Sequence, residues 1–135
     1  MMRLSVAVAL LVYSAAVVRA EEVADGTRSV PATLSFELDV MPILTARGCN
    51  QGACHGKARG QNGFQLSLLG FDSDFDYAAL THQARGRRVF FAAPERSLLL
   101  QKGTATIAHG GGVRLEPGGA DYDAILKWIT QGAPR

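Results

Sequence analysis

The two cysteines of this 135-residue chain stand five residues apart, and a histidine directly follows the second one. The stretch "GCNQGACHG", residues 48–56, contains Cys49, Cys54 and His55. The stretch from Cys49 to Gly63 is rich in glycine and small polar residues and indicates a loop. Large loops in so small a domain need something to fold around. The cysteines indicate a covalent cofactor, a disulfide or a metal site, and the choice depends on the compartment in which the chain works.

The N-terminus predicts that this compartment lies outside the cytosol. "MMRLSVAVALLVYSAAVVRA" has a positive start at Arg3, an apolar stretch over residues 4–18 and a small residue, Ala20, at its end. This is the pattern of a secretory signal peptide, cut after Ala20. The apolar stretch is shorter than the roughly 18 residues that cross a bilayer comfortably, although an uncleaved anchor is an alternative. We expect an exported protein, periplasmic or on the cell surface, with no stable membrane span after cleavage.

Charge and length limit the remaining possibilities. Removal of residues 1–20 takes away two of the 14 basic residues, and the 12 that remain balance 12 acidic residues. A formally neutral chain gives no support to a nucleic-acid partner, for which a clustered basic excess is expected. Residues 21–34 have no hydrophobic periodicity and predict a flexible leader. Residues 35–135 suffice for one domain with one core.

Hydrophobic spacing predicts a mainly α-helical domain with large loops and at most one short strand or hairpin. We expect a first helix that runs into Cys49, with Ser35 as a candidate N-cap. Either this helix starts near Asp39 with Pro42 in its first turn, or it is kinked at Pro42. The other expected elements, in chain order, are a strand over 64–71, a helix over 72–86, a short helix over 93–102, a glycine-rich loop over 104–119 and a last helix over 120–133.

The order of the cysteines and the histidine favours haem c among the possibilities. In such sites two cysteines form thioether bonds to the porphyrin, and the histidine after the second cysteine binds the iron. Two residues usually separate the cysteines, whereas four do so here. A longer loop can bulge without moving the sulfurs apart, and Gly52 would tolerate a tight backbone. The motif therefore predicts one covalent haem c on Cys49 and Cys54, with His55 as proximal iron ligand.

Other chemistries fit the motif less well. A disulfide between the two cysteines is feasible in an exported protein and stays open. A closed zinc site needs two further nitrogen or sulfur ligands, for which the chain offers only His82 and His109. Redox chemistry of the thioredoxin type prefers two residues between the cysteines and a following strand and helix.

The stretch from Cys49 to Leu115, with the closing "YDAILKWITQGAP", resembles the cytochrome-c-like domains near the N-terminus of large secreted proteins of Planctomycetes and related bacteria. The resemblance covers nearly all of the predicted mature chain. It implies a cytochrome c-like fold, electron transfer, and a redox partner protein or following domains as partners. Outside the motif, the positions that match the pattern of the broader cytochrome c family are Pro94, Ser97, Leu98 and Lys102, then Trp128, Ile129, Gly132 and Ala133.

The sequence departs from the broader cytochrome c family in its wider attachment loop and in the absence of a methionine from the distal loop. Met41, on the helix before the motif, is poorly placed to reach the opposite haem face. His109 in "TIAHGGGV" stands where the distal methionine of the family would stand. The resemblance therefore implies His109 as the distal iron ligand, with His82 or an open sixth position as alternatives.

No residue set predicts catalysis, because paired carboxylates, "GxSxG" and a nucleophile with a base are missing from the sequence. We therefore expect an electron carrier rather than an enzyme. A haem-free module linked by a disulfide, or a haem enzyme with an open distal side, are the alternatives. Two further interpretations also stay open. Arg85, Arg87 and Arg88 form a solvated turn or a clamp for haem propionates, and Trp128 packs in the core or on the porphyrin.

Overall fold

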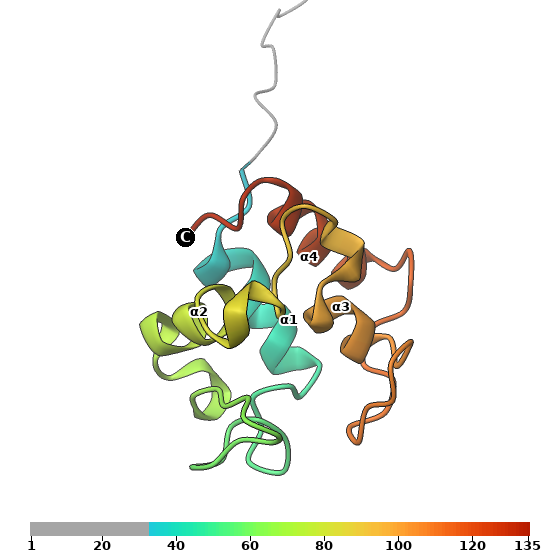
Figure 1. Cartoon of the computed structure of the whole chain (residues 1–135). Helices are drawn as coiled ribbons and strands as arrows, with labels where there is room; N and C mark the ends of the chain where they lie inside the picture. Colours follow the sequence, from blue (N-terminus) through green and yellow to red (C-terminus); the bar gives the residue numbers. More distant parts are fainter. Residues whose placement is uncertain (1–32) are drawn as a thin grey trace, which may run out of the picture. The chain divides into compact units, whose positions relative to one another are not determined.

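The computed structural model describes residues 33–135, which form a mainly α-helical unit. The predicted signal peptide and residues 21–32 of the predicted leader lie outside the described residues. The α-helices are α1 (Met41–Ala46), α2 (Ser73–Thr81), α3 (Leu98–Gly103) and α4 (Ala120–Thr130). A π-helical turn (Phe36–Val40) precedes α1, and 3-10 turns lie at Leu68–Gly70, Ala84–Gly86 and Pro94–Arg96 (Figure 1).

The N-terminal helix begins and changes form where the sequence predicts. The Ser35 hydroxyl accepts a hydrogen bond from the Leu38 amide and caps the first turn. Pro42 has no N–H to donate to the preceding turn, and its ring crowds that turn. The chain therefore forms the wider π-helical turn before Pro42 and a regular α-helix from Met41 onward.

The expected strand over residues 64–71 is not formed. This segment has one isolated antiparallel bridge, between Gln61 and Phe64, and then a 3-10 turn. The amide of Leu66 donates to the carbonyl of His55 at 2.8 Å, so the segment follows the motif loop instead of pairing with another strand. Of the alternating apolar residues in this segment, Leu66 is buried and Phe64 is partly buried, whereas Leu68 is 55 % exposed.

The second and third helices are shorter than the sequence predicts. Asp72 caps α2 through a hydrogen bond to the Phe75 amide, as expected of an acidic helix start. The helix ends at Thr81, not at the predicted Gly86. Pro94 begins a separate 3-10 turn, and α3 starts only at Leu98. The predicted final helix is present as α4, which begins at Ala120 as expected but ends at Thr130 rather than at residue 133.

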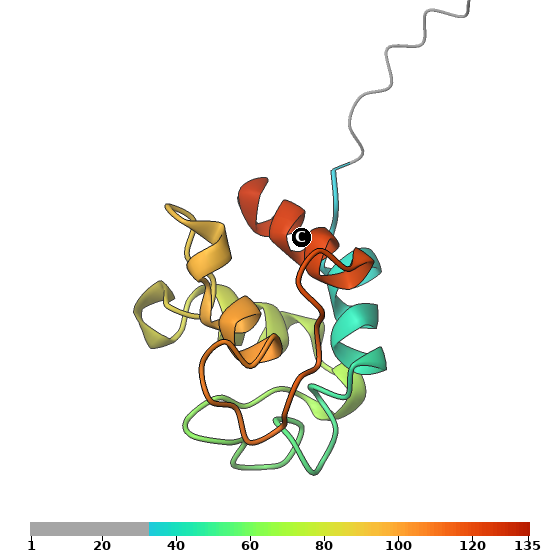
Figure 2. The same cartoon turned by 90° about the vertical axis from the view of Figure 1, so that its right-hand side faces the viewer.

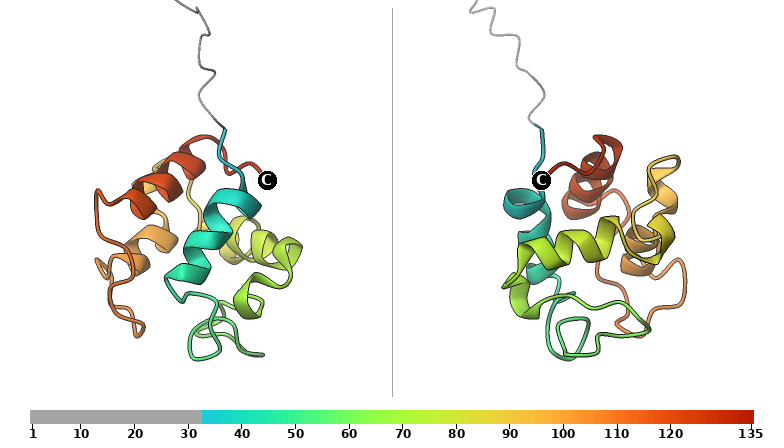
Figure 3. Two further views of the ribbon diagram at one scale, coloured as in Figure 1. Left: turned by 180° about the vertical axis from the view of Figure 1, so that it is seen from behind. Right: turned by 60° about the vertical axis from the view of Figure 1, so that its left-hand side comes forward.

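The core lies where α4 meets the N-terminal turn. Trp128 is fully buried, and its ring centre lies 5.7 Å from that of Phe36. The Pro134 carbonyl accepts hydrogen bonds from the indole N–H of Trp128 at 2.7 Å and from the Phe36 amide at 3.1 Å. The C-terminus therefore lies beside the start of the described chain (Figure 3). Among the described residues, no helix has the length and apolar content to cross a membrane.

Two long loops occupy the other end of this unit. The loop over residues 49–63 and the loop over residues 104–114 both extend away from α4, and the two views of Figures 1 and 2 agree on this. The cysteine motif and the glycine-rich segment therefore lie together at the end of the unit that is opposite to α4.

Candidate functional site

A cavity of about 590 Å³ lies between these two loops and the helices. Its volume is within the range of pockets that hold cofactors and small ligands. The cavity wall includes four of the residues that the sequence singles out, namely Cys49, Cys54, His55 and His109. The structure therefore brings the predicted attachment motif and the predicted distal ligand to one site.

The four residues between the cysteines fold into a compact turn. The Cys49 amide donates to the Leu44 carbonyl at 2.8 Å and so continues from α1. The His55 amide then donates back to the Cys49 carbonyl at 3.0 Å. Because this bond closes the loop at its base, the wider spacing does not open the motif.

The glycine on which this turn depends is not the one that the sequence suggests. A β-carbon on Gly52 would meet only a Leu68 methyl, at 3.9 Å, so a side chain fits there. A β-carbon on Gly56 would lie 1.9 Å from the carbonyl oxygen of Asn50. Close packing of the loop therefore requires a glycine directly after the histidine, and the assignment of this role to Gly52 was wrong.

Cys49 and Cys54 are not joined to each other and are both partly buried. Burial raises the pKa of the Cys49 thiol to about 11, against an opposing effect of the Arg114 guanidinium. Cys49 is therefore a protonated thiol at neutral pH. The thiolate is the form that attacks disulfides and binds metals, so Cys49 is poorly suited to either reaction in this state.

The imidazole of His55 is held in one tautomer. Its Nδ1 lies 2.9 Å from the carbonyl oxygen of Phe64. Because a carbonyl only accepts, Nδ1 carries the proton and Nε2 keeps its lone pair. Burial lowers the pKa of His55 below its usual value, and the charges of His109 and Arg88 act in the same direction. His55 thus presents a neutral, oriented nitrogen that is suited to bind a metal.

His109 is held in the same way on the other loop. Its Nδ1 lies 3.0 Å from the carbonyl oxygen of Gly112, so Nε2 is again free. The rings of His55 and His109 are within 5° of parallel, with their centres 6.3 Å apart. A metal bound between two imidazoles holds the ring centres about 6 Å apart, since each metal–nitrogen bond is about 2 Å and each nitrogen lies about 1 Å from its ring centre. The spacing fits one metal ion shared by the two rings.

Two basic side chains hold the loop of His109, and sequence reasoning gave neither of them this role. The Lys102 ammonium donates to the Ala108 carbonyl at 2.6 Å, and the Arg114 guanidinium to the Gly111 carbonyl at 2.8 Å. In the sequence, Lys102 stood out only because it matches the family pattern, and nothing in the sequence marked Arg114 as a functional residue. Phe64, whose ring lies 4.4 Å from that of His55, was assigned to a strand. Contacts of basic side chains with carbonyls leave no pattern in sequence.

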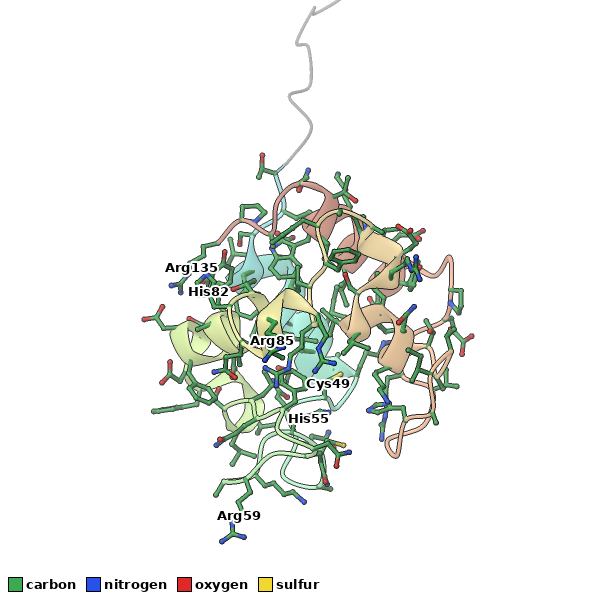
Figure 4. All side chains as sticks on the ribbon, in the orientation of Figure 1. Cys49, His55, Arg59, His82, Arg85 and Arg135 are labelled. Carbon is green, nitrogen blue, oxygen red and sulfur yellow. The ribbon has the colours of Figure 1, made fainter. Side chains whose placement is uncertain are left out.

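The structure does not bring the other candidates to the cavity wall. His82 is exposed, packs against Tyr77 and is drawn beside Arg135, away from His55 (Figure 4). Met41 is buried against Gly70 and is not part of the cavity wall. Its position before the motif had already indicated that it is poorly placed to act as a distal ligand. Trp128 lies in the core and is likewise not part of the cavity wall.

The charged side chains of the cavity wall are all basic. Four cations line it, and no aspartate or glutamate is among the lining residues: the cations are Arg87, Arg88, Lys102 and Arg114. Within residues 33–135, no three His, Cys, Asp or Glu side chains cluster closely enough to hold a bare metal ion. The basic side chains of the cavity wall would suit a ligand that carries acidic groups.

Compared with protein-family models, curated proteins and solved structures, the chain matches none of them.

Proposed function

We propose that this chain is a small c-type cytochrome, with one haem bound to Cys49 and Cys54 and ligated by His55 and His109. The observation that carries the proposal is the pair of parallel imidazoles, 6.3 Å apart, on the wall of the cavity that both cysteines line. The predicted signal peptide agrees with this function, because cytochromes of this type acquire their haem outside the cytosol. We expect a redox partner protein, or following domains of a longer chain, to exchange electrons with it.

Each residue of the site has a defined task in this function. Bound haem supplies an iron that takes up and releases one electron. The cysteines hold the porphyrin edge, and the carbonyls of Phe64 and Gly112 keep both imidazoles in the tautomer that ligates through Nε2. Two imidazole ligands give a lower reduction potential than one imidazole and one methionine. With Cys49, Cys54, His55 and His109 holding it, the haem would serve as an electron carrier, and we propose no catalytic reaction for the site.

Mass spectrometry of the exported protein tests the proposal. The chain is produced in a host that has cytochrome maturation factors, and its denatured mass is measured. We expect the mature polypeptide plus one haem, and the bare polypeptide for the variant in which Cys49 and Cys54 are both alanine. A mass equal to the polypeptide less two hydrogens would show a disulfide and overturn the proposal.

Absorbance then tests the two iron ligands. A low-spin spectrum that carbon monoxide leaves unchanged is expected when His55 and His109 both bind. His109→Ala should let carbon monoxide bind, whereas His82→Ala serves as the control and should behave as the unmodified protein. A His109→Ala protein that keeps the original spectrum would remove His109 from the site.

A further inference from the structure

Arg88 is a buried cation without a carboxylate partner among the described residues. Its side chain belongs to a residue only 9 % exposed. The ion pairs of residues 33–135 join Arg47 to Asp121 and Arg135 to Glu37 and Asp74. Burial lowers the pKa of Arg88, and the neighbouring charge of Arg87 adds to this effect. A buried charge that lacks an opposite charge destabilises a fold, so this position requires an explanation.

The guanidinium of Arg88 is fixed in place by neutral groups. One terminal nitrogen donates to the Ala79 carbonyl at 2.6 Å and to the Gln83 side chain at 3.1 Å. The other donates to the Gly63 carbonyl at 2.5 Å, and the plane lies 4.5 Å from the centre of the Phe64 ring. These contacts use three of its five N–H groups. Within the described part of the chain, Nε–H and one terminal N–H have no acceptor.

The two unused N–H groups belong to a residue of the cavity wall. A guanidinium can pair with a carboxylate through two parallel hydrogen bonds, and it keeps its charge at all relevant pH values. Since no acidic side chain lines the cavity, a carboxylate that pairs with Arg88 there would come from the ligand. The fixed orientation means that little side-chain freedom is lost when the ligand binds.

We propose that Arg88 binds a carboxylate of the ligand in this cavity, which under the proposed function is a propionate of haem. The identity of the carboxylate rests on that proposed function. Arg88 also packs on Phe64, whose carbonyl orients His55. The carboxylate is therefore bound on the same wall as the proximal ligand. Of the three arginines in this turn, Arg85 is exposed and is not among the lining residues.

The pH dependence of the reduction potential tests this inference in the haem-loaded protein. A propionate paired with Arg88 stays ionised to low pH, so the potential of the unmodified protein should be flat over mildly acidic and neutral pH. In Arg88→Gln the pKa of the propionate should rise by one unit or more, about a tenfold gain in proton affinity. A sloping region should then appear in the mildly acidic range. Arg88→Lys, which keeps the charge, should restore most of the flat profile.

The control is Arg85→Gln, which removes the same charge from the same turn and should leave the profile unchanged. The remaining titratable side chains of the cavity wall are the two iron ligands, the two attached cysteines, Lys102 and the other arginines. Apart from Arg88 itself, these side chains are the same in Arg88→Gln and in Arg85→Gln. An inflection that is specific to Arg88→Gln would therefore belong to the propionate.

Failure of this inference differs from failure of the proposed function. If Arg88→Gln carries covalent haem and has the profile of Arg85→Gln, Arg88 does not bind the propionate, and the cytochrome proposal stands. If the unmodified chain acquires no haem, the cytochrome proposal fails and the propionate falls with it.

A measurement on the unmodified protein decides the case where Arg88→Gln does not fold. In the reduced protein labelled with nitrogen-15 arginine, the Arg88 Nε–H should exchange slowly and show a nuclear Overhauser effect to a propionate methylene. Arg88→Lys identifies the resonance. Rapid exchange of this proton would overturn the inference.

Discussion

Gly111 lies against the imidazole of His109. The substitution Gly111→Ala, which adds one methyl group there, therefore tests whether His109 is the distal ligand. A β-carbon on Gly111 would lie 2.9 Å from Cε1 of the ring, closer than such contacts occur. The ring is at the end of a side chain and will move, so we expect Gly111→Ala to displace His109 at little cost to folding. Cyanide should then bind the oxidised protein at least tenfold faster.

Gly110→Ala is the matched control for this change. A β-carbon on Gly110 would have no atom within 4 Å. Gly110→Ala and Gly111→Ala both add one methyl group to the same loop, so their intrinsic effects on the backbone are matched. Cyanide binding should stay at the rate of the unmodified protein. Equal rates in both alanine variants would contradict the position of His109 at the sixth ligand site.

A second pair of glycines tests the motif loop. Gly56→Ala would place a β-carbon 1.9 Å from the Asn50 carbonyl, and because the obstacle is backbone, the loop itself must shift. We expect the yield of covalent haem per chain to fall by at least half. Gly52→Ala, inside the same motif, should attach haem normally because its site has room. Haem stain intensity per unit of protein measures both, and equal yields would show that the loop tolerates the shift.

At this scale the sequence predicts which residues meet but not how each is oriented. The adjacency of Cys54 and His55 is visible in the sequence, and both residues line the cavity. The carbonyls of Phe64 and Gly112 carry no side-chain signature, because every residue has a carbonyl. Their role depends on backbone positions that only the folded chain defines.

Lys102 links an element to a loop, because it leaves the last turn of α3 and binds the Ala108 carbonyl next to His109. A hydrogen bond from a charged donor in a partly exposed place is worth about 1 kcal/mol. We expect Lys102→Met to loosen the loop over residues 104–114, with amide exchange there about fivefold faster, and to raise the high-spin fraction of the haem.

The control for this change is Lys127→Met on α4, an exposed lysine that does not line the cavity. Exchange in the loop should be unaffected by it. Lys102→Arg keeps a donor at the same place and should restore slow exchange. An unaltered loop in Lys102→Met would show that Arg114 and the backbone hold it without help.

Helices were predicted better than their ends. Ser35 and Asp72 cap helices as expected, because a side chain that accepts from a nearby amide acts within one turn. The end of α2 at Thr81 was missed, since the chain there turns to bring Arg88 back under Ala79. The strand over residues 64–71 was wrong for a similar reason: its amides bind the motif loop, and an alternating pattern does not reveal the partner.

The whole molecule is divided between a packed end and an end built around a cavity. Trp128 and Phe36 close the first end without any ligand. At the second end, the partly exposed side chains of Leu98 and Leu99 line the cavity. Covering such a leucine with a ligand contributes part of the roughly 1.5–3 kcal/mol that full burial of an exposed leucine gives. Because domains are stable by only about 5–15 kcal/mol, several such contacts form a large part of the total.

We therefore expect the chain that lacks haem to lose stability without losing its helices. In the variant with Cys49 and Cys54 both replaced by serine, the midpoint of thermal unfolding should fall by more than about 10 °C, the shift that a loss of roughly 2–3 kcal/mol gives in a domain of this size. Far-ultraviolet circular dichroism should keep most of its signal below the transition. The near-ultraviolet signal of Trp128, the only tryptophan, should also persist because its pocket is formed by the packed end. A variant as stable as the unmodified protein would mean that the cavity end needs no ligand to fold.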